Sequence, residues 1–257
     1  MPVAGPLPAP DHLYLVRAAA LPAFRPVFDA LSHMGFYNFD PDRMRDPQPR
    51  DSDEMLAHDG GNIASVLARW QPNNERIAEY LAAAIPGVRG VRAETVGTKD
   101  SVKFLQRVID DEAPWSFPAT SMSDGALRVL GVLSALFQVG SSTQNDVALV
   151  GIEEPETSLH PGAVGGLRDA LQEASQAKQV LVTSHSPELL DDRRIDPNSI
   201  IAVIARDGIT EMGPLNEATL SVVRDRLYTA GELMRMEQFD PEQRNPEMMG
   251  ELSQDRR

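Results

Sequence analysis

The 257-residue sequence contains no cysteine, which excludes a disulfide framework, a cysteine-ligated zinc site and a thiol nucleophile. It also lacks any apolar run close to the ~20 residues needed to cross a bilayer. Residues 1–10 have neither the basic region nor the apolar region of a signal peptide. We therefore expect a cytoplasmic protein that makes no membrane contact.

Basic side chains are few: 24 Lys and Arg residues stand against 38 Asp and Glu residues, giving a formal charge of -14. Such a surface repels phosphate backbones, so we expect nucleic acid to be bound only indirectly, through a partner. The only lysines are Lys99, Lys103 and Lys178, and none of them follows a Gly-x-x-x-x-Gly run. The sequence therefore has no P-loop, the lysine-containing turn that cradles nucleotide phosphates.

What is present has the composition of a folded domain, with 42% apolar and 24% charged residues. In the first part of the chain, apolar residues recur at helical spacing over 21–34, 63–70 and 77–84. Residues 36–39 favour a short strand or turn before a polar loop at 41–53, and residues 88–97 and 101–109 alternate as an antiparallel pair. We predict a helical insert with antiparallel strands over residues 1–112.

The pattern after residue 113 is typical of a layered α/β domain. Continuous apolar runs predict buried parallel strands at 147–152, 179–183 and 199–205, and helical patterns at 162–176 and 187–190 lie between them. An almost wholly apolar helix at 127–137 should be buried, with Ser121 or Ser123 as its cap. A hairpin at 206–213 and a helix at 217–227 follow. We predict a core domain over 113–236 and a disordered tail over 237–257.

Two adjacent carboxylates, Glu153 and Glu154, follow the first of these apolar strands. The carboxyl edge of a parallel sheet is where α/β folds place ligands. In phosphoryl transfer, one such carboxylate holds Mg²⁺ directly or through water, and its neighbour orients or deprotonates the attacking water. The pattern assigns the first role to Glu153 and the second to Glu154. The structural alternative is an acidic strand end that opens a solvated loop.

Two further stretches carry polar groups to the same region. His185 follows the strand at 179–183, and a neighbouring parallel strand would place its imidazole beside the carboxylate pair, although a lone histidine after a strand is commonly a cap or a packed residue. Ser123 and the backbone amides of Asp124 and Gly125 open the buried helix and form an anion site. A plain helix cap is the alternative for Ser123.

These stretches, in this order, resemble the C-terminal half of an ABC-type ATPase head, specifically ATPases related to RecF-like, SMC-like and OLD-like proteins. Met122–Ala126 is similar to the signature loop, Val147–Glu154 to the Walker B strand with its catalytic glutamate, and Ser158–Pro161 to the D-loop. His185 is similar to the switch histidine. Residues 13–110 resemble the helical insert of the group and its flanking strands.

The resemblance implies an α/β fold with the parallel sheet of a P-loop NTPase, and ATP and Mg²⁺ as ligands. It implies nucleotide contacts at Ser123, Asp124 and Gly125, catalytic roles for Glu154 and His185, Mg²⁺ binding at Glu153, and D-loop contacts at Ser158, Leu159 and His160. Two residues depart from the pattern of the family: Glu153 stands where aspartate is more common, and Asp124 replaces the first glycine of the signature.

The absent P-loop is the largest departure, because in the family it precedes the insert; the chain looks as though it begins after that segment. ABC heads work in pairs, in which the signature loop of one chain closes over a nucleotide held by the P-loop of the other. The sequence therefore favours an ATPase subunit that works as a homo- or heterodimer with a P-loop-bearing chain.

Two alternatives come from other functional classes. In the first alternative, the chain is a non-catalytic remnant or regulatory module that binds a related ATPase. In the second it is a metal-dependent hydrolase or nuclease that uses Glu153, Glu154, Glu156, His160 and His185 as ligands. Adjacent residues of an extended backbone point to opposite sides, so Glu153 and Glu154 are poorly placed to bind one metal together.

Overall fold

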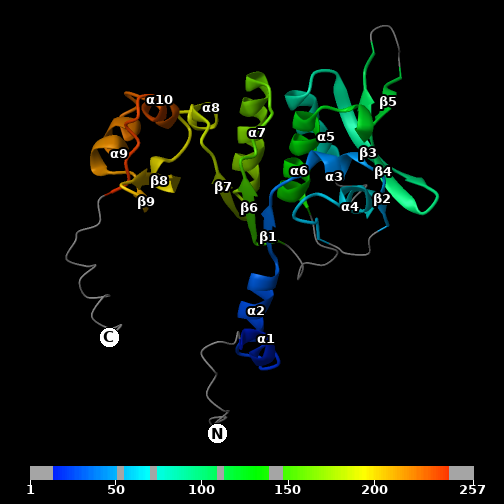
Figure 1. Cartoon of the computed structure of the whole chain (residues 1–257), viewed down its shortest axis with the longest axis horizontal. Coiled ribbons are helices and arrows are strands. Elements are labelled where there is room, and N and C mark those ends of the chain that lie inside the picture. Colours follow the sequence, from blue (N-terminus) through cyan, green and yellow to red (C-terminus); the bar gives the residue numbers. More distant parts are fainter. Residues whose placement is uncertain (1–13, 51–54, 70–73, 109–112, 139–146, 243–257) are drawn as a thin grey trace. The chain divides into compact units, whose positions relative to one another are not determined.

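The computed structural model describes residues 14–50, 55–69, 74–108, 113–138 and 147–242. Contacts between Cα atoms divide the chain into unit 1, Met1–Ser184, and unit 2, His185–Arg257. Each unit is described by itself below (Figure 1). This division into units does not test the predicted domain limits at residues 112 and 236, which stay predictions. Among the described residues, no helix has both the length and the apolar content of a membrane span.

Unit 1 contains the predicted parallel sheet. Its strands lie in the order β1 (Met34–Tyr37), β6 (Leu149–Glu153) and β7 (Gln179–Thr183), and both pairings are parallel. Helix α7 (Pro161–Ala174) joins β6 to β7, as a parallel crossover requires. Helix α6 (Asp124–Phe137) contacts β1 and β6, where Tyr37, Val150 and Ile152 are buried. The α/β fold with a parallel sheet is therefore confirmed.

The strand prediction needs correction in two places. Strand β7 is parallel as expected but forms the end of the sheet in the described residues, and its side chains alternate between exposed and half-buried. The predicted third strand, β8 (Ile201–Arg206), lies in unit 2 and pairs antiparallel with β9 (Ile209–Pro214). Asp207 and Gly208 take positive φ values of 53° and 78°, which favours a two-residue hairpin turn. An apolar run alone cannot distinguish the two kinds of pairing.

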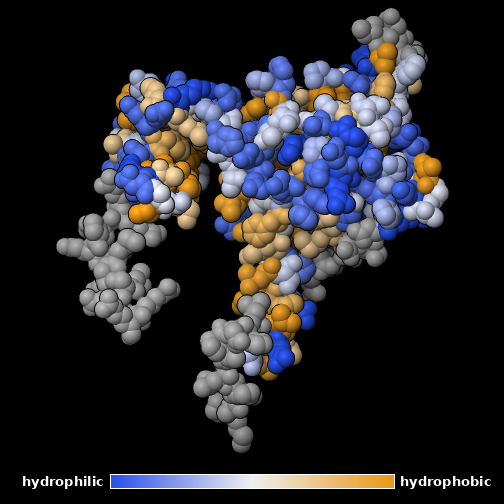
Figure 2. All heavy atoms as spheres, in the orientation of Figure 1, coloured by the Kyte–Doolittle hydropathy of each residue, from blue (hydrophilic) through white to orange (hydrophobic). Residues whose placement is uncertain are grey.

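One face of the parallel sheet is open. Phe36 on β1, Gly151 on β6 and Leu181 on β7 form a row across the strands. Phe36 is 57% exposed and Leu181 is 51% exposed. Apolar surface continues over α1 (Leu15–Ala18) and α2 (Arg25–Ser32), which have no buried residues (Figure 2). Helix α2 lies within the predicted helix at 21–34, and its apolar stripe remains uncovered in the described residues.

An antiparallel sheet forms the other part of unit 1. Strands β3 (Val88–Val96) and β4 (Lys99–Gln106) pair as predicted, with Gly97 at φ 63° in the turn. Strand β4 also pairs with β2 (Gln48–Pro49) and with β5 (Trp115–Pro118). Helices α4 (Ile63–Arg69) and α5 (Asn74–Ala84) contact β3. The helices and the antiparallel strand pair predicted for this region are thus present, and their role as an insert stays a prediction.

The loop predicted at 41–53 is wrong in part, because it contains β2 and the short helix α3 (Pro41–Arg45). Asp40 caps α3: its Oδ1 atom accepts a hydrogen bond from the Asp42 amide at 2.9 Å. An Asp-Pro pair is a helix-start signal, with the aspartate at the N-cap and the proline in the first turn. The polar composition of the segment concealed it.

Helices α5 and α7 are joined by a polar cluster around Glu173. Its carboxylate accepts hydrogen bonds from the Tyr80 hydroxyl at 2.8 Å and from Arg76 Nε at 3.0 Å. The bond from Tyr80, followed by the bonds from Arg76, lowers the pKa of Glu173. Burial, with the carboxylate of Glu173 as a further cause, raises the pKa of Tyr80 to about 12.

This raised pKa predicts an alkaline loss of stability. The folded state favours neutral Tyr80, so its contribution is complete below the unfolded pKa of ~10 and is lost as the pH rises to about 12. We expect the wild-type free energy of unfolding to fall relative to that of Tyr80→Phe over this window. Urea denaturation at pH 8, 10 and 11.5 measures it, with the exposed Tyr228→Phe as the matched control. A constant difference between wild type and Tyr80→Phe would contradict the prediction.

Unit 2 has a small core of its own, formed by Ile200, Ala202, Leu215 and Ala230. It contains α8 (Pro187–Leu190), the 3-10 turn Pro197–Ser199, the β8–β9 hairpin, α9 (Glu217–Arg224) and α10 (Ala230–Arg235). The hairpin predicted at 206–213 begins earlier, because its first strand is β8, which the sequence assigned to the parallel sheet. The helix predicted at 217–227 is present as α9, which ends at Arg224.

The first residues of the predicted tail, 237–242, contact the rest of unit 2. Phe239 packs against the core of unit 2, the Asp240 carbonyl accepts from the Asn216 amide at 3.1 Å, and Pro241 forms a β-bridge with Leu215. An apolar residue and a backbone pairing thus hold a stretch that is polar on average. The rest of the predicted tail, 243–257, lies outside the described residues.

Candidate functional site

The carboxyl edge of the parallel sheet brings two side chains together. Glu153 is the last residue of β6 and is exposed. Asn38 directly follows β1, and its Nδ2 atom donates a hydrogen bond to Glu153 Oε2 at 2.7 Å. The amide of Asn38 therefore orients the carboxylate that the sequence assigned to Mg²⁺. Asn38 was missed, because its position depends on β1 being part of this sheet.

Glu154 is held in an unusual backbone conformation. Its φ is 42°, and its amide donates to the Thr183 carbonyl of β7 at 2.9 Å. Its Oε2 atom accepts a hydrogen bond from Thr157 Oγ1 at 3.1 Å. A non-glycine residue in the left-handed region costs on the order of 1–3 kcal/mol, and such residues cluster at functional sites. The chain thus turns sharply at the second carboxylate and fixes its side chain.

Glu156 ties the loop after β6 to the end of β7. Its Oε1 atom accepts a hydrogen bond from Ser184 Oγ at 2.5 Å, and its Oε2 atom is buried without a partner in the described residues. Together with the backbone bond between Glu154 and Thr183, this contact joins the two strand ends. From the sequence, a metal-binding role for Glu156 arises only in the hydrolase alternative.

The predicted signature loop begins α6. Ser123 caps the helix, since its Oγ atom accepts a hydrogen bond from the Ala126 amide at 3.3 Å. A Cβ atom placed on Gly125 would lie 2.3 Å from the Ser158 carbonyl oxygen. Gly125 is therefore needed for close packing against the predicted D-loop. The structure thus brings these two predicted loops into direct contact.

The other predicted D-loop residues have visible structural roles. Ser158 takes a φ of 67°, and Leu159 is half-buried beside Gly125. His160 caps α7, because its Nδ1 atom accepts from the Gly162 amide at 3.1 Å. The roles of these three residues toward a nucleotide stay predictions.

Arg45 is a second residue that the sequence did not indicate. It ends α3, and its Nη1 atom donates to the Met122 carbonyl at 2.9 Å. Its Nη2 atom forms an ion pair with the Asp124 carboxylate. The signature loop is thus held from outside by a side chain about 80 residues earlier in the sequence.

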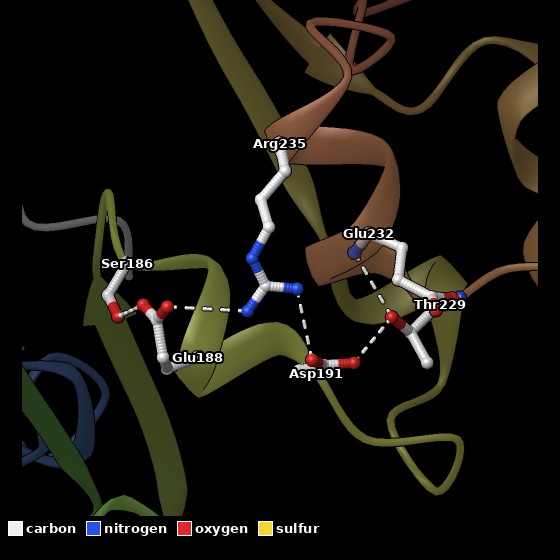
Figure 3. Close-up of polar contacts among 6 residues, drawn as sticks. All are labelled: Ser186, Glu188, Asp191, Thr229, Glu232 and Arg235. Carbon is white, nitrogen blue, oxygen red and sulfur yellow. Dashed lines mark hydrogen bonds and ion pairs between the residues drawn. The ribbon is translucent and has the colours of Figure 1, made fainter. Parts of the chain in front are cut away.

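His185 opens unit 2, so its predicted pairing with Glu154 stays a prediction. The helix α8 that follows it is fixed to α10 (Figure 3). Arg235 contacts Asp191 Oδ2 at 3.0 Å and Glu188 Oε1 at 3.3 Å, and Ser186 Oγ donates to Glu188 Oε2 at 2.9 Å. Bonds from its own amide, from Ser186 and from Arg235 lower the pKa of Glu188.

The α8–α10 contact is also close at the backbone level. A Cβ atom on Gly231 of α10 would lie 2.2 Å from the Pro187 carbonyl oxygen. Thr229 completes a capping box with Glu232 and donates its hydroxyl to Asp191 Oδ1 at 2.7 Å (Figure 3). His185 therefore lies just before α8, which hydrogen bonds, ion pairs and close backbone packing hold against α10.

The donor set at the sheet edge suits Mg²⁺ held mainly by phosphates and water, which needs only one or two carboxylates from the protein. The described ranges contain no group of three or more His, Asp or Glu side chains that could hold a metal ion. The hydrolase alternative, which needs such a group, stays a prediction.

The parallel sheet and its acidic edge define a domain related to P-loop, ABC-type ATPases. A family model described as "AAA domain, putative AbiEii toxin, Type IV TA system" matches residues 37–191. This match spans more than half of the chain, and the chain belongs to this family. No curated protein matches the sequence.

Several solved structures resemble the fold at low identity. An SMC ATPase studied for ATP-driven dimerization and DNA-stimulated activation is 19% identical, with a TM-score of 0.43 over 62% of this chain and 91% of that one. The Smc head of Pyrococcus yayanosii is 17% identical, with a TM-score of 0.44 over 62% and 29%. The Smc head of Pyrococcus furiosus, bound to a domain of ScpA, is 16% identical, with a TM-score of 0.46 over 62% and 38%. The chain thus spans less than half of the two Pyrococcus proteins.

Proposed function

We propose that this chain provides the Walker B, signature and D-loop elements of an ABC-type ATPase head, and that it hydrolyses ATP together with a P-loop from outside these 257 residues. The observation that carries the proposal is the sheet edge, where Glu153 beside Asn38 and the fixed Glu154 follow a buried strand. Family membership over residues 37–191 supports it.

Each candidate residue has a role in this proposal. Glu153 binds Mg²⁺ directly or through water, and Asn38 orients its carboxylate. The metal supplies charge neutralisation at the phosphates. Glu154 orients or deprotonates the attacking water, and His185 contacts the γ-phosphate. ATP hydrolysis is otherwise a matter of positioning and electrostatic stabilisation.

The signature side serves the nucleotide of the opposing chain. Ser123 and the amides of Asp124 and Gly125 would contact its γ-phosphate, and the D-loop residues Ser158, Leu159 and His160 would lie beside them at the interface. The close packing of Gly125 on Ser158 supports one shared surface for both loops. The assembly is a homo- or heterodimer whose partner contributes the P-loop.

The test uses the chain combined with a strand–P-loop–helix segment, fused at its N-terminus or added as a second polypeptide. The chain alone should bind MgATP weakly or not at all, because its β- and γ-phosphate contacts would be missing.

Ser123→Ala in the combined protein should keep the ATP affinity of the monomer and weaken MgATP-dependent dimerisation. Calorimetry measures the ATP affinity of the isolated chain and of the variant, and light scattering with and without MgATP measures dimerisation.

The control for this variant is Ser121→Ala, which lies in the preceding 3-10 turn, Ala119–Ser121. Loss of the Ser123 cap costs ~0.5–2 kcal/mol of stability by itself, and thermal melts read this separately. If Ser123→Ala weakens dimerisation equally with and without nucleotide, Ser123 acts only as a helix cap. Micromolar MgATP binding by the isolated chain would refute the need for an external P-loop.

A further inference from the structure

The guanidinium of Arg45 contacts three groups. It donates to the Met122 carbonyl at 2.9 Å, pairs with the Asp124 carboxylate, and lies 3.6 Å from Asp42 Oδ1 through its Nε atom. Met122 and Asp124 flank Ser123, so Arg45 contacts the loop on both sides of that serine. The side chain of Arg45 is half-buried, whereas that of Asp124 is mostly exposed.

Asp124 presents an electrostatic difficulty for the proposed function. Its carboxylate lies in the first turn of α6, where the helix dipole favours a negative charge. A γ-phosphate arriving at Ser123 would compete for the same amides and would be repelled by the carboxylate. The ion pair with Arg45 offsets the charge of Asp124.

The segment that carries Arg45 is itself firmly held. The Asn38 amide donates to the His58 carbonyl at 2.9 Å, while its side chain binds Glu153. Phe39 lies against α6, since a Cβ atom on Gly131 would be 2.7 Å from its ring. Residues 38–45 therefore form a continuous link between the proposed Mg²⁺ carboxylate and the loop around Ser123.

We infer that Arg45 is a positioning residue of the ATPase site, which fixes the loop around Ser123 and cancels the charge of Asp124. This inference rests on the proposed function. It explains how a signature loop with an aspartate in place of glycine remains compatible with a phosphate. A lysine could supply the charge at Arg45 but not the planar, two-pronged contact with Met122 and Asp124.

The experiment measures MgATP-dependent dimerisation of the full chain combined with the P-loop segment. Arg45→Ala should weaken it at least tenfold. The double variant Arg45→Ala with Asp124→Asn should return to within about threefold of wild type, because both charges of the pair are removed together. Arg45→Lys should fall between wild type and Arg45→Ala. The matched control, Arg43→Ala, removes an exposed arginine of the same helix and should have no effect.

The outcomes separate this inference from the proposed function. If Arg45→Ala dimerises like wild type while Ser123→Ala does not, the inference fails alone. A double variant as weak as Arg45→Ala would also overturn it, because it would show that Arg45 only supports the fold. If the wild type shows no MgATP-dependent dimerisation, or if both single variants are unaffected, the proposed function fails and the inference fails with it.

Discussion

Replacing Glu154 with glutamine should leave MgATP binding intact and lower hydrolysis by ~10²- to 10⁴-fold, the usual contribution of a general base. Glutamine keeps the size of the side chain and an oxygen that can accept the hydrogen bond from Thr157 Oγ1. It removes the ability to take a proton from water. The measurement is steady-state phosphate release by the chain combined with its P-loop segment, together with MgATP binding by calorimetry.

Glu156→Gln is the matched control for this prediction. Glu156 is two residues further along the same loop, and a glutamine oxygen can still accept the hydrogen bond from Ser184. We expect less than a tenfold change in its turnover. Wild-type turnover in Glu154→Gln would exclude Glu154 as the residue that activates water. A similar loss in both variants would mean that the loop, and not a particular carboxylate, sets the rate.

The parts predicted correctly from sequence are those in which local chemistry decides. The buried strand that ends in Glu153 combines an apolar run with an abrupt change to acid. A serine cap was expected at Ser121 or Ser123 because both precede an apolar helix, and Ser123 is the cap. The β3–β4 pair has clear alternation on both strands. Neighbours in sequence determine each of these features.

The features that were missed depend on contacts between distant segments. Asn38 meets Glu153 across 115 positions, and Arg45 meets Asp124 across 79. A polar residue after an aromatic strand, or an arginine in a polar loop, carries no signal of its partner. The pairing of β8 likewise depended on Asp207 and Gly208, since a continuous apolar run fits either a parallel or a hairpin strand.

Adding a strand–P-loop–helix segment should convert the isolated chain from a marginally stable, aggregation-prone protein into a well-behaved one. In unit 1, β7 ends the described part of the parallel sheet, and Phe36 and Leu181 lie open on one face. Uncovered strand edges and apolar faces promote aggregation.

The size of the effect follows from burial. Full burial of a large apolar side chain contributes ~1.5–3 kcal/mol, and covering half of Phe36 and half of Leu181 gives about 1.5–3 kcal/mol. That is a measurable share of a typical domain stability of ~5–15 kcal/mol. At ~2–4 °C per kcal/mol, the melting temperature should rise by about 3–12 °C. Dye binding should fall in parallel.

Thermal melts, dye binding and light scattering, with and without the segment, test this prediction. Leu181→Thr keeps a strand-forming residue on β7 but removes its apolar surface, so it should lower dye binding by the isolated chain and also reduce the rescue. Thr98→Ser, in the turn between β3 and β4, is the control and should change neither. A cooperative melt above ~65 °C by the isolated chain as a clean monomer would contradict the prediction, because mesophilic domains seldom exceed this temperature. It would show that the open sheet face needs no covering segment for stability.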